Sequence, residues 1–147
     1  MARLSKFDKR MFEKAKEVAE TSDFDHFHLG CVITYKHHIL SAESNSSKTH
    51  PIQKYYNHRY RNFRRGTKPC SHTIHAEMAA INAIPYPIGI QVDWNDVNVY
   101  VYRIAPGLPQ QRGIARPCAA CMAALKNLGI RNIYYTTDGG FAYERLD

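Results

Sequence analysis

The sequence predicts an α/β fold, a three-layer α/β/α sandwich in which helices cover both faces of a five-stranded mixed sheet. Short runs rich in β-branched residues alternate along the chain with longer segments whose apolar residues recur at helical spacing. The last two of these runs are separated by only about four residues. A parallel pair would need a crossover of about a dozen residues or more, so we expect the last two strands to be antiparallel.

The N-terminal part of the chain has the pattern of a helix followed by a β-hairpin. Over residues 5–20 the apolar side chains fall near one face, and Ser5 with Asp8 has the spacing of a capping box. The runs 31–35 and 39–43 are rich in β-branched or apolar residues and are separated by a tight turn. We therefore expect this helix to cover one side of a sheet that includes the hairpin.

The rest of the chain supplies two further helices of clear pattern and three more strands. A helix is predicted over 73–83, because small and apolar residues recur there and prolines follow. Valines alternate with other residues over 97–102, which is typical of a strand. Another helix is predicted over 118–128, with Gly129 as its C-cap. The remaining predicted strands are 130–136 and 141–146.

Length and composition limit what the chain can be. Its 147 residues, 44% of them hydrophobic, are enough for a buried core, and we expect one domain over residues 1–147. There is no run of about eighteen apolar residues, which argues against a membrane span, and the N-terminus lacks the apolar core of a signal peptide. We therefore expect a cytoplasmic protein with no membrane partner, in which the four cysteines are not paired as disulfides.

The excess positive charge lies in one segment. The chain has a net charge of +7, and residues 48–68 hold seven Lys or Arg and no Asp or Glu, while the other residues carry equal numbers of both signs. Apolar side chains within the segment have the spacing of a stripe on a helix: Ile52, Tyr56, Tyr60 and Phe63. We interpret 48–68 as a basic helical insertion that either lies in solvent or forms a pocket wall that meets phosphate. Its charge favours an anionic substrate or partner.

Two short motifs far apart in the sequence combine into one candidate site. Residues 73–78 contain His-x-Glu, and residues 116–122 contain Pro-Cys-x-x-Cys. Zinc prefers Cys and His ligands in a tetrahedron, and a catalytic zinc site keeps one position open for water. Cys118 and Cys121 are one helical turn apart, so both thiolates can face the same way. We expect Pro117 in the first turn of this helix, where its missing N–H has no partner to lose.

His75 and Glu77 complete the candidate site. We predict that His75 is the third ligand of one zinc ion. Glu77 is too close to His75 in sequence to be an easy second ligand from the same helix, and it suits a general acid and base that moves protons between water and substrate. The alternative is a structural zinc site closed by Cys70 or His72, in which Glu77 is an ordinary acidic residue of a first helical turn.

These motifs resemble the signature of the zinc-dependent nucleobase deaminases. With Asn45 and the order of the predicted elements, they make the chain similar to the cytidine deaminase-like superfamily. The resemblance implies hydrolytic deamination of a base, with Glu77 as the catalytic residue. It also implies a single catalytic zinc ion on His75, Cys118 and Cys121.

Four further residues are candidates for substrate contact. The resemblance implies that the backbone N–H of Ala76 holds the carbonyl of the base and that Asn45 contacts the sugar, although Asn45 also lies in a sequence typical of a turn. His28 lies in the turn that leads into the first predicted strand, and Arg103 follows the third, so both are candidates for the pocket lining.

The resemblance favours a free pyrimidine nucleoside or nucleotide as substrate: cytidine, deoxycytidine or deoxycytidylate. Members that act on free cytidine share a C-terminal hairpin of the kind predicted here, and the basic segment 48–68 favours a phosphorylated substrate. Two alternatives stay open. One is a cytosine deaminase that binds single-stranded DNA or RNA through the basic and aromatic residues of 48–68. The other is a non-catalytic, zinc-stabilised binding module.

Two features of the sequence are less typical of the superfamily. Most members pass almost directly from the third strand to Pro-Cys, whereas residues 104–115 intervene here. The resemblance therefore does not predict the structure of the neighbouring pocket wall. Some deoxycytidylate deaminases hold an additional zinc ion near the positions of Cys70 and His72, but no full set of ligands is evident. Because members are commonly dimers or tetramers, we also expect a homo-oligomer.

Overall fold

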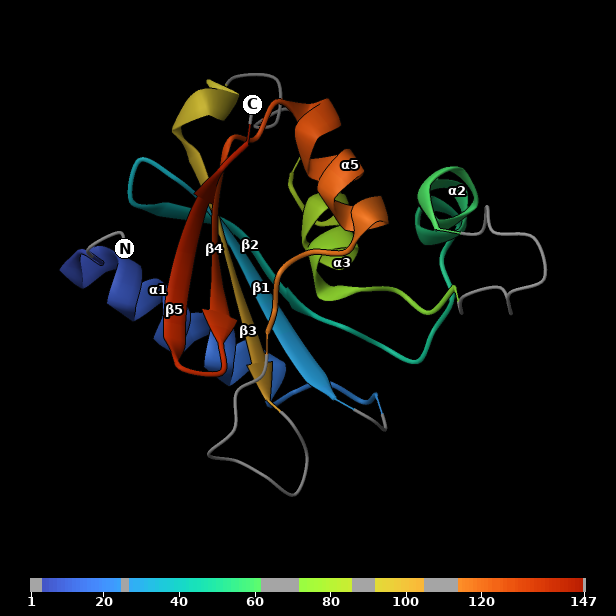
Figure 1. Cartoon of the computed structure of the whole chain (residues 1–147), viewed down its shortest axis with the longest axis horizontal. Helices are drawn as coiled ribbons and strands as arrows, with labels where there is room; N and C mark the ends of the chain where they lie inside the picture. Colours follow the sequence, from blue (N-terminus) through green and yellow to red (C-terminus); the bar gives the residue numbers. More distant parts are fainter. Residues whose placement is uncertain (1–3, 25–26, 62–71, 86–91, 105–113, 147) are drawn as a thin grey trace.

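The computed structural model describes residues 4–24, 27–61, 72–85, 92–104 and 114–146 (Figure 1). The elements follow in the order α1 (Lys6–Ala19), β1 (His28–Tyr35), β2 (His38–Ser44), α2 (Pro51–Tyr60), α3 (Ala76–Asn82), η1 (Trp94–Asp96), β3 (Val97–Ile104), α5 (Ala119–Leu128), β4 (Asn132–Thr137) and β5 (Gly140–Arg145). Among these described helices, none has the length and apolar character needed to cross a membrane.

Five strands form one mixed sheet in the order β2-β1-β3-β4-β5. β1 is antiparallel to both of its neighbours, β3 and β4 are parallel, and β4 and β5 are antiparallel. The parallel pair is joined through α5, which supplies the crossover that parallel strands require. The predicted mixed sheet and its antiparallel last pair are therefore confirmed.

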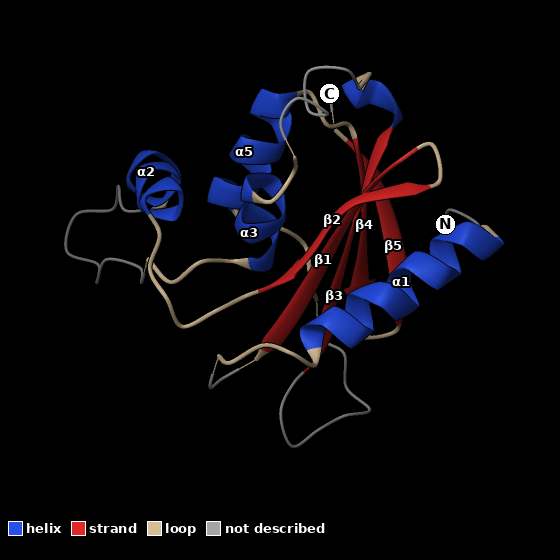
Figure 2. Cartoon of the chain, turned by 180° about the vertical axis from the view of Figure 1, so that it is seen from behind, coloured by secondary structure: helices blue, strands red, loops and turns tan. Residues whose placement is uncertain are grey.

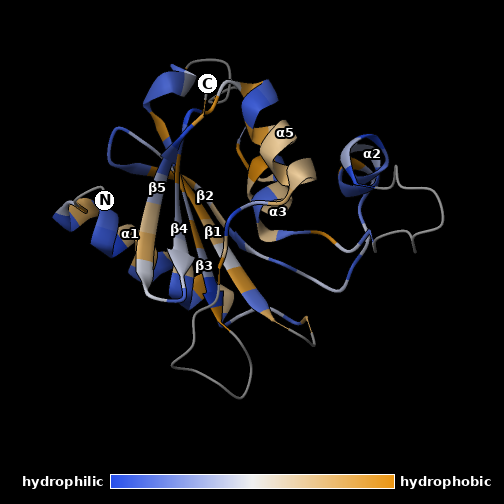
Figure 3. Cartoon of the chain, in the orientation of Figure 1, coloured by the Kyte–Doolittle hydropathy of each residue, from blue (hydrophilic) through white to orange (hydrophobic). Residues whose placement is uncertain are grey.

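Helices cover both faces of this sheet. α1 lies on one face, and α3 and α5 lie on the other (Figures 1 and 2). Neighbouring residues of β1 alternate between the two layers, because Val32 packs in the cluster under α1 while Cys31 and Ile33 pack under α3 and α5. Hydrophobic residues run along the central strands between these layers (Figure 3). The predicted three-layer sandwich is confirmed.

The capping box predicted at the start of α1 is present and also forms a tertiary contact. The Asp8 N–H donates to Ser5 Oγ at 3.0 Å, and the Ser5 N–H donates to Asp8 Oδ2 at 2.9 Å. The second carboxylate oxygen of Asp8 accepts a hydrogen bond from the Tyr100 hydroxyl of β3 at 2.6 Å. One carboxylate thus begins α1 and ties it to the middle of the sheet.

The helix predicted from residue 73 begins three residues later, at Ala76. Thr73 forms an isolated β-bridge with Thr49, and the Ile74 N–H donates to the carbonyl of Lys48 at 2.9 Å. Residues before Ala76 therefore have extended backbone, because a distant segment satisfies their hydrogen bonds.

The prediction that Pro117 lies in the first turn of a helix is wrong. α5 begins at Ala119 with Cys118 as its N-cap, so Pro117 precedes the helix. A proline disfavours helical backbone at the residue before it, which is Arg116. Cys118, after the proline, still has extended backbone, so the helix begins only at Ala119. At the other end, Gly129 has a left-handed φ of 100° and is the predicted C-cap.

The basic segment contains α2, which lies beside α3 and α5 and away from the sheet (Figure 1). Ile52, Tyr56 and Tyr60 pack against a buried cluster of α3 and α5 residues: Met78, Ala120, Cys121 and Ala124. The predicted apolar stripe is confirmed for these three residues, and Phe63 lies outside the described residues.

Candidate active site

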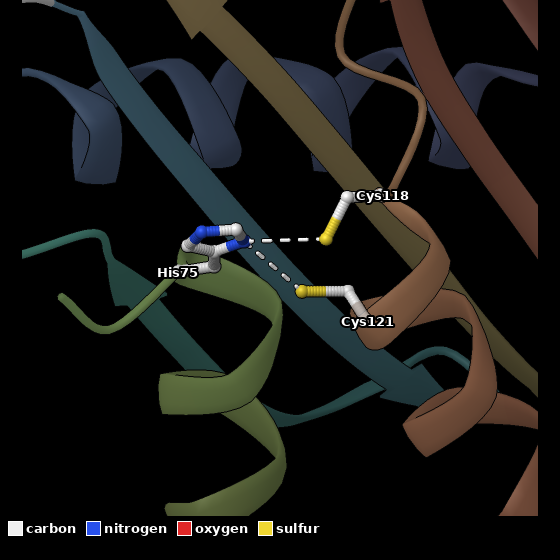
Figure 4. A group of neighbouring side chains, drawn as sticks. All are labelled: His75, Cys118 and Cys121. Atoms are coloured by element: carbon white, nitrogen blue, oxygen red, sulfur yellow. Dashed lines mark hydrogen bonds between the residues drawn. The ribbon is translucent and has the colours of Figure 1, made fainter. Parts of the chain in front are cut away.

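The first residues of two helices bring the predicted metal ligands together. His75 is the N-cap of α3, Cys118 is the N-cap of α5, and Cys121 follows one turn later. Figure 4 shows His75 Nδ1 facing both thiols, at 3.6 Å from Cys118 Sγ and 3.3 Å from Cys121 Sγ. Two motifs more than forty residues apart thus form one three-donor group.

The geometry of this group fits a tetrahedral metal ion. With zinc–nitrogen bonds of about 2.0–2.1 Å and zinc–sulfur bonds of about 2.3 Å, a tetrahedron has nitrogen–sulfur edges of about 3.6 Å. The separations of His75 Nδ1 from the two Sγ atoms are close to this value. In the part of the chain that the structure describes, the group contains three donors and no fourth. Catalytic zinc sites have three protein donors of this kind and keep the fourth tetrahedral position for water or substrate.

The structure also bears on the alternative of a structural zinc site in which Cys70 or His72 is the fourth ligand. His72 lies outside the three-donor group, and its Nδ1 accepts a hydrogen bond from the side-chain amide of Asn57 at 3.2 Å. Cys70 lies outside the described residues. In this structure His72 is therefore a hydrogen-bond acceptor for Asn57 and is not part of the three-donor group.

Glu77 lies in the first turn of α3 and is only 3% exposed. Its Oε1 is buried and has no hydrogen-bond partner among the described residues. Burial is the largest influence on this carboxyl, and it raises the pKa of Glu77 despite the opposing charge of His75. A buried carboxyl of this kind, on the pocket that His75 and Cys118 also line, suits proton transfer.

Each of the three donors changes the pKa of at least one neighbour in the group. A hydrogen bond from Cys121 lowers the pKa of Cys118, and the same bond raises the pKa of Cys121. Burial alone would lower the pKa of His75, but its hydrogen bond with Cys118 and the nearby negative charges raise it instead. Cys118 is therefore the thiol that most readily exists as the thiolate a metal requires.

A pocket of about 210 Å³ opens beside these groups. Its lining comes from β1, the two helix starts, the end of β3 and the approach to α5: Phe27, Leu29, His75, Glu77, Arg103, Ile114, Ala115, Arg116 and Cys118. Both arginines, Arg103 and Arg116, are on the wall, and among the described residues only Arg116 has an acidic partner, since it forms two hydrogen bonds of 2.9 Å with the Glu144 carboxylate.

Arg103 is a pocket-lining cation with one buried donor that has no partner among the described residues. Its guanidinium lies over the Phe27 ring at 5.1 Å from the centroid, and its Nε has no hydrogen-bond partner among the residues that the structure describes. Its backbone N–H donates to Thr136 Oγ1 at 3.2 Å, which anchors the end of β3. Arg103 therefore presents a fixed positive charge to the pocket, where sequence analysis predicted a substrate contact.

Asn45 and His28 lie behind the pocket lining and not in it. Asn45 is 4% exposed, and its Oδ1 accepts hydrogen bonds from the Leu29 N–H at 2.9 Å and from Ser22 Oγ at 2.6 Å. Its Nδ2 donates to the Phe27 carbonyl at 3.2 Å. The His28 ring makes a 3.0 Å hydrogen bond with the Phe24 carbonyl. In this structure Asn45 supports two wall residues, and its predicted sugar contact stays a prediction.

Ala76 is fully buried as the first residue of α3. Its N–H is one of the four at a helix start that have no partner within the helix. It adjoins His75 and Glu77 in sequence, and the predicted contact of its N–H with the carbonyl of the base stays a prediction.

Two kinds of residue near the site were not predicted from the sequence. Phe27 and Leu29 line the pocket, and their position at the start of the first strand, beside the candidate His28, was the available signal. Gln53 and Asn57 are buried against the segment that carries His75. They lie one turn apart next to the apolar stripe, and this spacing was the only sign in the sequence that they share a face of the helix.

Residues 5–137 match the family described as the cytidine and deoxycytidylate deaminase zinc-binding region. The chain belongs to this family. The match spans both motifs, so the donor group of this deaminase-family chain lies within the matched region. No curated protein matches it.

Solved deaminases share the fold of this family member. Cytidine deaminase from Burkholderia pseudomallei superimposes with a TM-score of 0.59 and 13% identity, covering 97% of this chain and 93% of that one. The dCMP deaminase of cyanophage S-TIM5 superimposes with a TM-score of 0.56 and 13% identity, covering 92% of this chain and 86% of that one. At such identities the likeness concerns the fold alone.

Proposed function

We propose that this chain hydrolytically deaminates the cytosine base of a free nucleoside or nucleotide, with one zinc ion on His75, Cys118 and Cys121. The observation that supports it most is a three-donor group, with no fourth donor among the described residues, two of whose members, His75 and Cys118, line the same pocket as the buried carboxyl of Glu77. Membership of a cytidine and deoxycytidylate deaminase family agrees with this chemistry.

Each group then has a stated task. Zinc, when bound, makes the water at its open position acidic enough to lose a proton near neutral pH. Glu77 accepts that proton and delivers it to the ring nitrogen, and it then moves the second proton of the added water to the departing amine, so that water and the amino-pyrimidine become a carbonyl and ammonia. The Ala76 N–H holds the carbonyl of the base. The water-poor surroundings of Glu77, which is 3% exposed, keep this proton transfer within the site.

Arg103 favours a nucleotide over a nucleoside. Among the described residues, no acidic side chain forms an ion pair with Arg103, whereas Arg116 forms an ion pair with Glu144. A planar guanidinium suits a phosphate group, because its N–H groups can donate to two phosphate oxygens at once. The cyanophage dCMP deaminase of the same fold was crystallised with dCMP and dUMP. We propose a cytosine 5′-monophosphate as the preferred substrate, with Arg103 on its phosphate.

The first prediction concerns substrate choice. Purified protein is incubated with cytidine, deoxycytidine, CMP, dCMP and a cytosine-containing oligonucleotide, and ammonia and the uracil product are measured. We expect the highest kcat/KM on a monophosphate. In Arg103→Gln this value falls about 10- to 100-fold, the equivalent of about 1.5–3 kcal/mol for hydrogen bonds to a charged group, while nucleoside turnover changes little.

Arg59→Gln is the matched control, because Arg59 is exposed on α2 and lies over the Tyr55 ring at 5.2 Å. It removes the same charge outside the pocket and leaves monophosphate turnover unchanged. Equal losses on nucleoside and nucleotide in Arg103→Gln would remove Arg103 from the phosphate. Release of ammonia from none of the monomers would contradict the proposed reaction.

A cytosine deaminase acting on single-stranded nucleic acid is the second candidate. Tyr55 is 54% exposed on α2 with Arg59 above it, and such exposed rings beside cations can stack bases. Under this alternative, oligonucleotide affinity falls steeply with salt, and Arg59→Gln weakens it. A non-catalytic binding module would instead hold metal and release no ammonia from any substrate.

A further inference from the structure

α2 reaches the candidate metal centre through two buried amides. Gln53 and Asn57 lie one turn apart on this helix, and both are 0% exposed. Burial of a side-chain amide costs free energy unless its polar atoms find partners. An apolar pair at these positions would avoid that cost, so the partners of the two amides indicate why they are there.

Those partners are on the segment that ends in a metal ligand. Gln53 Oε1 accepts a hydrogen bond from the His75 backbone N–H at 3.0 Å. Gln53 Nε2 donates to Asn57 Oδ1 at 2.9 Å, and Asn57 Nδ2 donates to His72 Nδ1 at 3.2 Å. The two amides of α2 therefore hold the short segment from His72 to His75 at both of its ends.

Gln53 also replaces a cap that α3 lacks. In a capping box, a Glu or Gln three residues into the helix accepts the N–H of the N-cap. In α3 that position is Met78, which is apolar and fully buried, and the His75 ring makes no cap because it faces the thiols. Gln53 supplies the acceptor from another helix and so fixes the direction in which the His75 side chain leaves the backbone.

The start of α2 is tied to the same segment by backbone hydrogen bonds. The Ile74 N–H donates to the Lys48 carbonyl at 2.9 Å, and the Ser46 N–H donates to the Ile74 carbonyl at 3.1 Å. The His50 N–H donates to the carbonyl of His72 at 3.4 Å. α2 and the residues that lead into His75 therefore form one unit.

We propose that Gln53 is a positioning residue for the metal ligand His75, held in place by Asn57 and His72, and that α2 thereby sets the metal affinity of the site. This inference rests on the metal centre proposed above. Ligand distances in metal sites are held to within about 0.2 Å, so a ligand whose backbone is released binds more weakly. Gln53 does not line the pocket, so it acts through His75 and not on the substrate.

The second prediction tests this role by zinc affinity. Methionine in Gln53→Met keeps the length and approximate volume of the side chain and removes both polar atoms. We expect the zinc dissociation constant, measured by competition with a chromophoric chelator, to rise about 10- to 100-fold relative to wild type. The visible spectrum of the Co²⁺-loaded variant also changes, because one of the three donors is no longer held in place.

Ile52→Ala is the matched control on the same helix. Ile52 packs on the α3 and α5 cluster and does not bond to His75, so its loss lowers the thermal midpoint and leaves zinc affinity and the Co²⁺ spectrum as in wild type. Circular dichroism of the metal-free proteins checks folding. If Gln53→Met does not fold, Gln53→Asn, which is too short to reach His75, takes its place with the same expected loss.

Two results would overturn the inference. One is wild-type zinc affinity in the folded Gln53 variant, and the other is an equal loss of affinity in Ile52→Ala, which would make loosened packing the cause. Absence of zinc binding by wild-type protein is a different result, because it would overturn the proposed metal centre itself.

Discussion

At the scale of single residues, Glu77 is the residue whose burial the core alone does not explain. A buried carboxyl oxygen without a hydrogen-bond partner costs free energy, and Glu77 Oε1 has none among the described residues. Polar groups left in this state are concentrated at functional sites, where a bound ligand completes their hydrogen bonds. We expect water or substrate to do so here.

The third prediction follows from this state. Glu77→Gln keeps the shape of the side chain and the three metal donors, so zinc content measured by elemental analysis stays at the wild-type level. Turnover, measured as ammonia release, falls about 10²- to 10⁴-fold or more, because an amide cannot carry protons between water and base. Cys118→Ser is the contrasting variant, since it removes a donor and therefore loses zinc as well as activity.

The outcomes separate the two roles that a carboxylate can have beside a metal. Loss of zinc from Glu77→Gln would make Glu77 a ligand, and undiminished turnover would remove it from the proton transfer. Thermal unfolding of the metal-free variant gives an independent check. An amide carries no buried charge, so the variant is expected to be at least as stable as wild type.

At the scale of elements, the close approach of α1 to β1 decides how the first layer packs. Gly30 lies in β1 on the side that faces α1, and a Cβ built there would lie 2.0 Å from the Ala15 carbonyl oxygen and 2.6 Å from the Ala19 nitrogen. Both are backbone atoms of the helix, which cannot turn away as a side chain can. Only glycine fits without moving α1.

The fourth prediction is that Gly30→Ala is destabilising by about 3 kcal/mol, at the upper end of the usual cost of overpacking, because the helix itself has to shift. Chemical denaturation measures the free energy of unfolding. Gly139→Ala is the control, since a Cβ there meets nothing within 4 Å, and its effect is expected to stay within about 0.5 kcal/mol. Equal stability of the two variants would show that α1 adapts without cost.

Also at the scale of elements, local sequence patterns predicted well what is held locally. The Ser5 capping box and the Gly129 C-cap were predicted because each depends on residues a few positions apart. The start of α3 was misplaced by three residues because Thr73 and Ile74 bond to residues 48 and 49, which no local pattern reveals. Gln53 was missed for the same reason, since its partner His75 lies on another element.

At the scale of the whole molecule, the candidate site was more predictable than its walls. The donors and Glu77 sit in two short motifs whose residue types are set by metal chemistry, so the sequence identifies the group that the fold brings together. The pocket lining depends on how β1, β3 and the approach to α5 meet. Asn45, whose contact with a sugar stays a prediction, holds Phe27 and Leu29 through hydrogen bonds.

A hydrogen bond between the first helix and the central strand links the layers of the molecule. Tyr100 is fully buried on β3, and its hydroxyl donates to Asp8 of α1. Burial, followed by the bond to Asp8, raises the pKa of Tyr100, and burial with the Asp8 charge raises the pKa of Tyr134 to about 12. Both phenols therefore hold their protons more tightly in the folded chain than in the unfolded chain.

The fifth prediction is a loss of stability in alkali. An unfolded tyrosine ionises near pH 10, so below that pH both states keep their protons and this contribution to stability is complete. As pH rises from about 10 through 12, the unfolded chain loses protons that the folded chain retains, and the free energy of unfolding falls by up to about 1.4 kcal/mol per pH unit for the buried Tyr100 and by less for the half-buried Tyr134, whose charge solvent screens.

Tyr100→Phe separates this linkage from general alkaline damage. At neutral pH the variant loses about 1.5–3 kcal/mol, because Asp8 loses a hydrogen bond to a charged acceptor in the interior. Between pH 10 and 12 its stability falls less steeply than that of wild type, because one of the linked protons is absent. Tyr55→Phe, at a position 54% exposed, keeps the wild-type curve. Parallel curves for Tyr100→Phe and wild type, measured by urea denaturation across this range, would mean that the bond between α1 and β3 does not control alkaline unfolding.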